Sequence, residues 1–175
     1  MSEGIPEHVD LIRAAKQNSH YRGVFSIARM PRLCEYLANK NGQAKVDITL
    51  GDEGRNGVYL RGHAVASVNA VCQRCMQPMP YDIETNFELM LVEHEYQLEG
   101  VSEDIDTLLI TEVPSSLISI IEDELILGFS LVTMHPQDQC EATSLMKGEQ
   151  QLNEQQTSTE KENPFAVLKD FKIEG

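Results

Sequence analysis

The chain has 175 residues, 41% of them hydrophobic, which is enough for one hydrophobic core of ordinary size. It has no run of about 18 apolar residues and no apolar signal segment near its acidic start, so we expect a cytoplasmic protein without a membrane span. The net charge is −14, but residues 1–80 hold 10 Lys and Arg against 7 Asp and Glu, whereas residues 81–175 hold 4 against 21. This division indicates two kinds of partner surface, although the acidic half can also serve solubility alone.

The N-terminal third predicts two short helices with an extended segment between them. Apolar residues and an early proline favour a helix over Pro6–Gln17, and Val24–Ile27 is extended in pattern. A second helix is expected between Ala28 and Asn39, starting no earlier than Pro31 if the proline occupies its first turn.

The middle of the chain carries three segments in which apolar and polar residues alternate. They are Ala44–Leu50, Val58–Val71 and Tyr81–Leu91, joined by turn-forming residues. Alternation with period two is typical of strands with one buried face, so these segments predict an antiparallel β-meander. Pro78 and Pro80 are expected to exclude the segment 72–80 from strand pairing.

The rest of the chain predicts a short strand within 106–113, a helix over 114–128 and an extended segment over 129–134. The fold class is therefore α+β, an antiparallel sheet packed with a few helices, and we expect one domain over residues 1–140. Residues 141–162 are rich in Gln, Glu, Ser and Thr and predict a disordered linker. Residues 163–175 regain apolar side chains and predict a short docking segment.

The sharpest motif is Cys72-Gln-Arg-Cys75, which the pattern places in a turn between two strands. Two thiolates at this spacing can share one side of a tetrahedral metal, and His135 and Cys140 would complete a Cys3His zinc site. Two other interpretations stay open. In the first, the cysteines are thiols without a metal. In the second, they serve redox chemistry, which the sequence disfavours because a strand follows this motif, whereas thioredoxin-type motifs begin a helix. Cys34, among apolar neighbours, is expected in the core.

Charged residues suggest a binding role. We predict Arg13, Lys16, Arg22 and Arg74 as RNA contacts, because Lys and Arg neutralise phosphates; ordinary surface charge is the alternative. The acidic triplet 122–124 is interpreted as a solvated helix face, with Glu124 nearest the apolar stripe. We find no catalytic order of Ser, His and Asp and no phosphate-binding loop, so we expect neither an enzyme nor a small-molecule substrate.

Taken in order, these motifs resemble one family, the YceD proteins, or large ribosomal RNA subunit accumulation proteins. The matching segments are Arg13-Ala-Ala-Lys16 with Tyr21-Arg-Gly23, Val71-Cys-Gln-Arg-Cys75, Ile121-Glu-Asp-Glu-Leu-Ile126, His135 with Cys140, and Asn163-Pro-Phe-Ala-Val-Leu168. No single motif is specific, whereas their order and spacing along nearly the whole chain are.

The resemblance implies a cytoplasmic ribosome biogenesis factor that supports the synthesis, processing or stability of 23S ribosomal RNA. Its expected partners are precursor rRNA of the large subunit, large-subunit ribosomal proteins, or both. The alternative is a metal- or thiol-dependent enzyme of RNA metabolism, either a nuclease or a redox regulator. A metal nuclease would require carboxylates that converge on one pocket, which the sequence spacing does not indicate.

Overall fold

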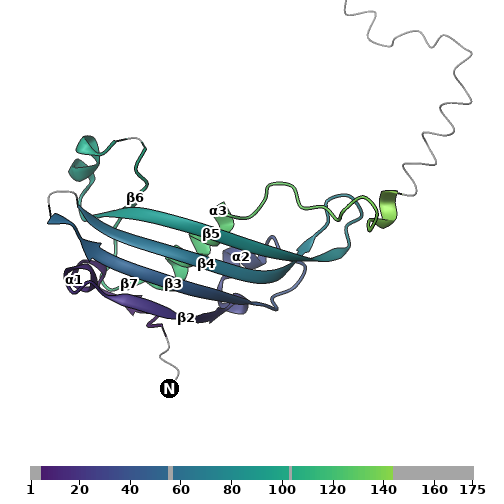
Figure 1. The fold of residues 1–175 in the computed structure, drawn as a ribbon, viewed down its shortest axis with the longest axis horizontal. Coiled ribbons are helices and arrows are strands. Elements are labelled where there is room, and N and C mark those ends of the chain that lie inside the picture. Colours follow the sequence, from purple (N-terminus) through teal and green to yellow (C-terminus); the bar gives the residue numbers. More distant parts are fainter. Residues whose placement is uncertain (1–4, 55–56, 103, 144–175) are drawn as a thin grey trace, which may run out of the picture. The chain divides into compact units, whose positions relative to one another are not determined.

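The structure is a computed structural model that describes residues 5–54, 57–102 and 104–143. Its centre is a five-stranded sheet in the order β2-β3-β4-β5-β6 (Figure 1). The strands are β2 (His20–Ser26), β3 (Gln43–Asp52), β4 (Val58–Val71), β5 (Pro78–Val92) and β6 (Thr107–Leu109). The first four pair antiparallel, whereas β6 runs parallel to β5. The predicted meander and the α+β class are confirmed.

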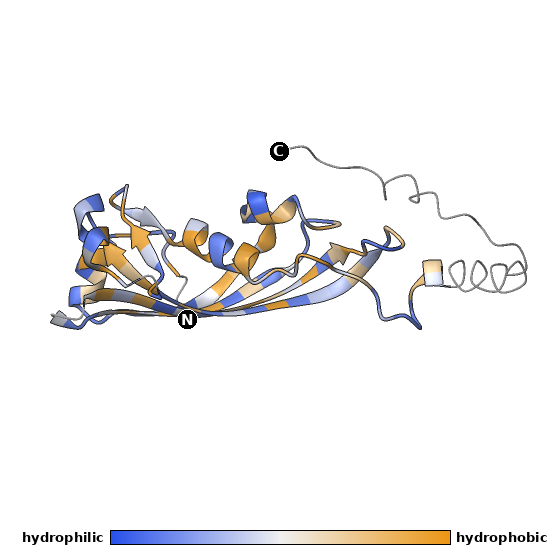
Figure 2. Ribbon diagram, turned by 90° about the horizontal axis from the view of Figure 1, so that it is seen from above, coloured by the Kyte–Doolittle hydropathy of each residue, from blue (hydrophilic) through white to orange (hydrophobic). Residues whose placement is uncertain are grey.

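The alternating residues of each strand divide the sheet into a buried inner face and an open outer face. The inner residues of the two central strands are apolar and buried, namely Ala44, Val46, Ile48, Leu50, Leu60, Ala64, Ala66 and Val68. The helices α1 (Leu11–Lys16), α2 (Pro31–Cys34) and α3 (Leu117–Leu127) add their own buried residues to this core. Among the described residues, helices lie on one side of the sheet and none covers the other side (Figure 2).

The N-terminal segment differs from the predicted helix over Pro6–Gln17. Residues 8–9 form β1 (His8–Val9), which pairs with β7 (Ser115–Ser116), and the helix starts only at Leu11. The Asp10 carboxylate caps this helix by accepting a hydrogen bond of 3.0 Å from the Arg13 amide. Strand pairing with a segment about 100 residues away thus replaces the first turn of the predicted helix.

The second predicted helix is also shorter than expected. Residues 27–29 form the 3₁₀ helix η1 (Ile27–Arg29), and α2 ends at Cys34 instead of continuing to Asn39. The chain then turns onto the sheet, where Leu37 pairs with Ala70 and the Ala38 amide donates to the Asn69 carbonyl at 2.8 Å. Contact with β4 therefore ends the helix.

The expectation that Pro78 and Pro80 are kept out of strand pairing was wrong. Both residues belong to β5, where Pro78 lies opposite Val71 and Pro80 opposite Asn69. The reason is that β6 pairs only with residues 90–92, so this part of β5 is a sheet edge. An edge strand tolerates proline because one of its sides needs no amide donors.

The predicted helix over 114–128 is present as α3, with Ser116 as its N-cap and Gly128 at its C-terminal end. The loop between β5 and β6 includes the 3₁₀ helix η3 (Glu95–Gly100). Residues 129–134 form no strand, but the Thr133 hydroxyl donates to the Val71 carbonyl at 2.8 Å. No helix in the described ranges combines the length and apolarity of a membrane span.

The described residues up to Met134 form one compact unit, and those from His135 onwards belong to a second. In the described part of the second unit, residues 135–143, the Gln139 amide donates to the Pro136 carbonyl and the Thr143 amide to the Cys140 carbonyl, each at 3.0 Å. Residues 144–162 of the linker predicted over 141–162, and the docking segment predicted over 163–175, lie outside the described residues, so both stay predictions.

Candidate metal centre and charged surfaces

The motif Cys72-Gln-Arg-Cys75 forms the turn between β4 and β5, as predicted. The Cys72 amide donates to the Gln77 carbonyl at 2.9 Å, and the Met76 amide donates back to the Cys72 carbonyl at 2.8 Å. Met76 has a φ of 59°, a conformation that non-glycine residues seldom adopt outside tight turns. The Gln73 amide donates to the Thr133 carbonyl at 2.8 Å, so residues 131–134 are tied to this turn.

The structure brings together the four residues that the sequence predicted as a metal site. One ligand atom from each of Cys72, Cys75, His135 and Cys140 lies within 4.8 Å of the others. Cys72 and Cys140 are buried, and none of the four cysteines of the chain forms a disulfide. Cys34 lies apart from this group and donates its thiol proton to the Ile27 carbonyl at 3.2 Å.

The donor set matches the chemistry of zinc. Three thiolates and one imidazole are a standard ligand set of structural zinc, with Zn–S bonds of about 2.3 Å and ligand atoms therefore about 3.8 Å apart. The spread of 4.8 Å requires the atoms to close by roughly 1 Å at most. Four protein ligands leave no open position on the metal, so this arrangement suits a structural rather than a catalytic ion.

The four predicted RNA contacts lie in three separate places. Arg13 and Lys16 are exposed on α1, whose buried side packs on the inner face of the sheet. Arg22 lies on the outer face, opposite Asp47 in the neighbouring strand. Arg74 is in the Cys72–Cys75 turn, at the Val71 end of β4, whereas α1 lies near the other end of that strand. Roughly 35 Å of β4 therefore separates Arg74 from α1 with Arg13 and Lys16.

The outer face carries charges that pair across strands. Asp47 accepts hydrogen bonds from His20 and Arg22, and these two interactions lower the pKa of Asp47. Arg61 contacts Glu53 at 2.7 Å and Glu88 at 2.9 Å, and its hydrogen bond lowers the pKa of Glu88.

A hollow on this outer face, missed by sequence reasoning, lies beside Arg22. The aliphatic side chains Val24 and Val65 line it together with Lys45. Val24 is half exposed, and Lys45 has no ion pair with any residue in the described ranges. The signal in the sequence was the position of Lys45 on the polar side of a predicted strand, but only the pairing of β2, β3 and β4 places it next to Arg22.

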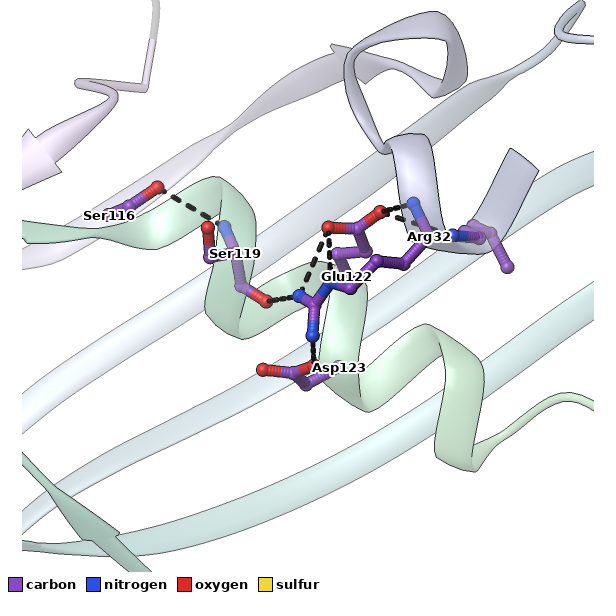
Figure 3. Close-up of polar contacts among 6 residues, drawn as sticks. Arg32, Ser116, Ser119, Glu122 and Asp123 are labelled. Atoms are coloured by element: carbon purple, nitrogen blue, oxygen red, sulfur yellow. Dashed lines mark hydrogen bonds and ion pairs between the residues drawn. The ribbon is translucent and has the colours of Figure 1, made fainter. Parts of the chain in front are cut away.

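The acidic triplet of α3 is not a uniformly solvated face. Glu122 is buried, and its carboxylate accepts hydrogen bonds from the backbone amides of Arg32 at 2.7 Å and Leu33 at 3.1 Å (Figure 3). The Arg32 guanidinium donates to Glu122 at 3.0 Å and also contacts Asp123, and its pKa is raised chiefly by the Asp123 hydrogen bond. Glu122 thus satisfies the first amides of α2 and joins it to α3.

Comparisons with known proteins point to one family. A family model described as "Large ribosomal RNA subunit accumulation protein YceD" matches residues 60–172. The chain belongs to the YceD family. A relative from Haemophilus influenzae (strain ATCC 51907 / DSM 11121 / KW20 / Rd), named "Large ribosomal RNA subunit accumulation protein YceD", is 30% identical over 169 residues. That alignment covers 96% of each of the two chains.

No solved structure matches this YceD-family chain. The family match begins within β4 and includes the Cys72–Cys75 turn, β5 and α3, together with His135 and Cys140.

Proposed function

We propose that this protein supports the accumulation of 23S rRNA as a binding factor in the assembly of the large ribosomal subunit, and that it acts in the cytoplasm without catalysing a reaction. The observation that carries the proposal is the match along 96% of the chain to a relative with that name. The open outer face of the sheet supports a binding role, because it offers paired charges, an apolar hollow and Lys45 in one accessible place.

The ratio of mature 23S to 16S rRNA in a deletion strain tests this function. We expect the ratio to fall, and we expect a plasmid that carries the intact gene to restore it. An unchanged ratio in the deletion strain, measured during exponential growth, would contradict the proposal.

The RNA contacts form a separate part of the proposal. Arg13, Lys16, Arg22 and Arg74 are assigned to phosphates, and the roughly 35 Å along β4 requires an RNA long enough to reach both ends of the sheet. We expect the triple substitution of Arg13, Arg22 and Arg74 by Gln to weaken binding of precursor rRNA fragments. The slope of log affinity against log salt should flatten by about one for each lost contact. Unchanged binding would leave ribosomal proteins as the partner class.

We also propose that Cys72, Cys75, His135 and Cys140 hold one structural zinc ion. Zinc would join the turn between β4 and β5 to the segment that begins at His135, which supplies folding free energy rather than catalysis. Protein purified without chelator is expected to contain about one zinc per chain by elemental analysis.

Cysteine variants separate a zinc site from plain thiols. Cys140→Ser is expected to lower the zinc content strongly, whereas Cys34→Ser, the matched control outside the cluster, leaves it unchanged. A chelator should lower the melting temperature of the intact protein and of the Cys34 variant, but have little effect on the Cys140 variant. Protein without metal that melts at the same temperature with and without chelator would favour unmetallated thiols.

A further inference from the structure

A second hollow lies at the edge of β5, just beyond the residues that pair with β6. Because β6 runs parallel to β5, the preceding residues Asp104 and Asp106 lie along this edge, close to Glu88. The C-terminal end of α3 closes the hollow with Glu124 and Leu127. Its volume is about 510 Å³, which accommodates a long side chain with part of its backbone.

The charge of this hollow has one sign. Four carboxylates line it, from Glu88, Asp104, Asp106 and Glu124, and no Lys, Arg or His does so. Arg61 pairs with Glu88 from outside the hollow, whereas the other three carboxylates have no ion pair with the described residues. The surrounding sequence strengthens the field, since residues 81–143 contain 15 Asp and Glu and no Lys or Arg.

Glu124 is the residue that points to a ligand. Its side chain faces the hollow although the residue is only 9% exposed, and no hydrogen bond to its carboxylate is made within the described part of the chain. Burial raises the pKa of Glu124, and the negative charges of Asp106 and Asp123 raise it further. Oxygens of this carboxylate without a hydrogen bond stay open to solvent through the hollow, because no side-chain oxygen or nitrogen buried in the described residues lacks a partner. A cation bound there would offset the repulsion from the neighbouring carboxylates.

The shape of the hollow favours a cationic side chain over a metal ion. Within the described ranges, the Cys72, Cys75, His135 and Cys140 group is the one set of three or more His, Cys, Asp and Glu whose ligand atoms converge closely enough for a metal. Beside the carboxylates lie the apolar side chains Phe87, Ile105 and Leu127, the last of which is 79% exposed. Lys and Arg have this mixed character, since an aliphatic stem carries a charged end.

We propose that the hollow around Glu124 binds a lysine or arginine side chain presented by a basic segment of a partner protein. The Glu124 carboxylate would hold the cationic end, Asp106 and Asp104 would surround it, and Leu127 would cover the stem. This site rests on the proposed function, because a factor in subunit assembly meets protein segments rich in Lys and Arg. Basic protein segments would then be the partners of the acidic half of the chain.

A model peptide tests the site directly. The probe is the acetylated and amidated peptide (Gly-Lys-Ala-Arg)3, titrated into the ¹⁵N-labelled full-length protein at low ionic strength. We expect the largest chemical-shift changes at the amides of residues 86–88, 104–106 and 124–128. Glu124→Gln is expected to weaken binding about tenfold, which corresponds to the loss of one charge-assisted hydrogen bond.

Glu35→Gln is the matched control. Glu35 is exposed and lies next to α2, and its substitution changes the net charge by the same amount as Glu124→Gln does. We expect it to change the affinity less than twofold. Asp106→Asn provides a second variant in the hollow and should weaken binding in the same direction as Glu124→Gln. The dispersion of the amide spectrum of each variant reports whether the fold is kept.

Three results besides a failed peptide titration would overturn the proposal. One is an equal loss of affinity in the Glu124 and Glu35 variants, which would mean a diffuse attraction to the acidic chain. The others are the same shifts on titration with MgCl2 alone, which would assign the hollow to a divalent cation, or with a 15-nucleotide oligouridylate, which would assign it to RNA. A failed peptide titration together with a low 23S to 16S ratio in the deletion strain removes only this site, whereas a normal ratio removes the proposed function.

Discussion

Glu122 and Glu124 are two residues apart on α3 and both are buried, but they face opposite environments. Glu122 points to α2, where two backbone amides and the Arg32 guanidinium satisfy its carboxylate. Glu124 points to the hollow at the edge of β5, where its neighbours are other carboxylates. The first site is complete within the chain, whereas the second is the one for which we propose a cationic occupant from a partner. Glu122 thus serves the fold on one side of this helix, and Glu124 lies at the proposed binding site on the other.

The largest effect is expected from removing the satisfied carboxylate. Glu122→Ala leaves the Arg32 and Leu33 amides without their acceptor and Arg32 without its buried partner, so we expect a loss of about 3–5 kcal/mol in the free energy of unfolding. Urea denaturation at pH 7 measures it. Asp123→Asn is the control, because Asp123 is half exposed and contacts only the outer end of Arg32. It should cost less than about 1 kcal/mol. Equal losses in both variants would contradict the role of Glu122 in holding α2.

Substitution of Glu124 is expected to raise the free energy of unfolding at pH 7, not to lower it. The folded protein holds a proton on this carboxyl to higher pH than the unfolded chain does, so stability falls as the pH rises from the ordinary value of 4.5 through the raised pKa. Glu124→Gln should therefore be more stable than the natural protein at pH 7, by about 1 kcal/mol, with the difference vanishing at pH 4. Thermal unfolding at the two pH values provides the measurement. A less stable variant at pH 7 would show that Glu124 has a partner in the free protein.

The smallest effect concerns the exposed pairs of the outer face. Asp47→Asn removes the negative charge and one of the two oxygens that accept hydrogen bonds from His20 and Arg22, and should cost about 0.2–1 kcal/mol at low salt, and less in 1 M NaCl. Because these bonds lower the pKa of Asp47, their contribution is present above the ordinary value of 3.8 and is lost as the pH falls through the lowered pKa. Asp82→Asn, an exposed change on the same face, is the control. A cost for Asp47→Asn that persists in 1 M NaCl would argue against simple surface pairing.

Much of the sheet could be predicted because its information is local. The alternation of Val58–Val71 was sufficient to place the whole of β4, and Ser116 and Gly128 bound α3 close to the expected ends. The turn at Cys72–Cys75 followed from its position between two alternating segments. In each case a strand or helix has one buried side, and that side imposes its period on the residues along the segment.

The tertiary structure decided what each of these segments contacts. The pairing of β1 with β7 shortened the first helix, the bridge from Leu37 to Ala70 ended α2, and the short β6 left a sheet edge that admits Pro78 and Pro80. The same holds for charge. Helical periodicity ranks Glu122 and Glu124 by their angle to the apolar stripe, but it contains nothing about Arg32, which is 90 residues away. Whether a buried carboxylate is satisfied or unpaired depends on which distant segment packs against it, and that information exists only in the folded chain.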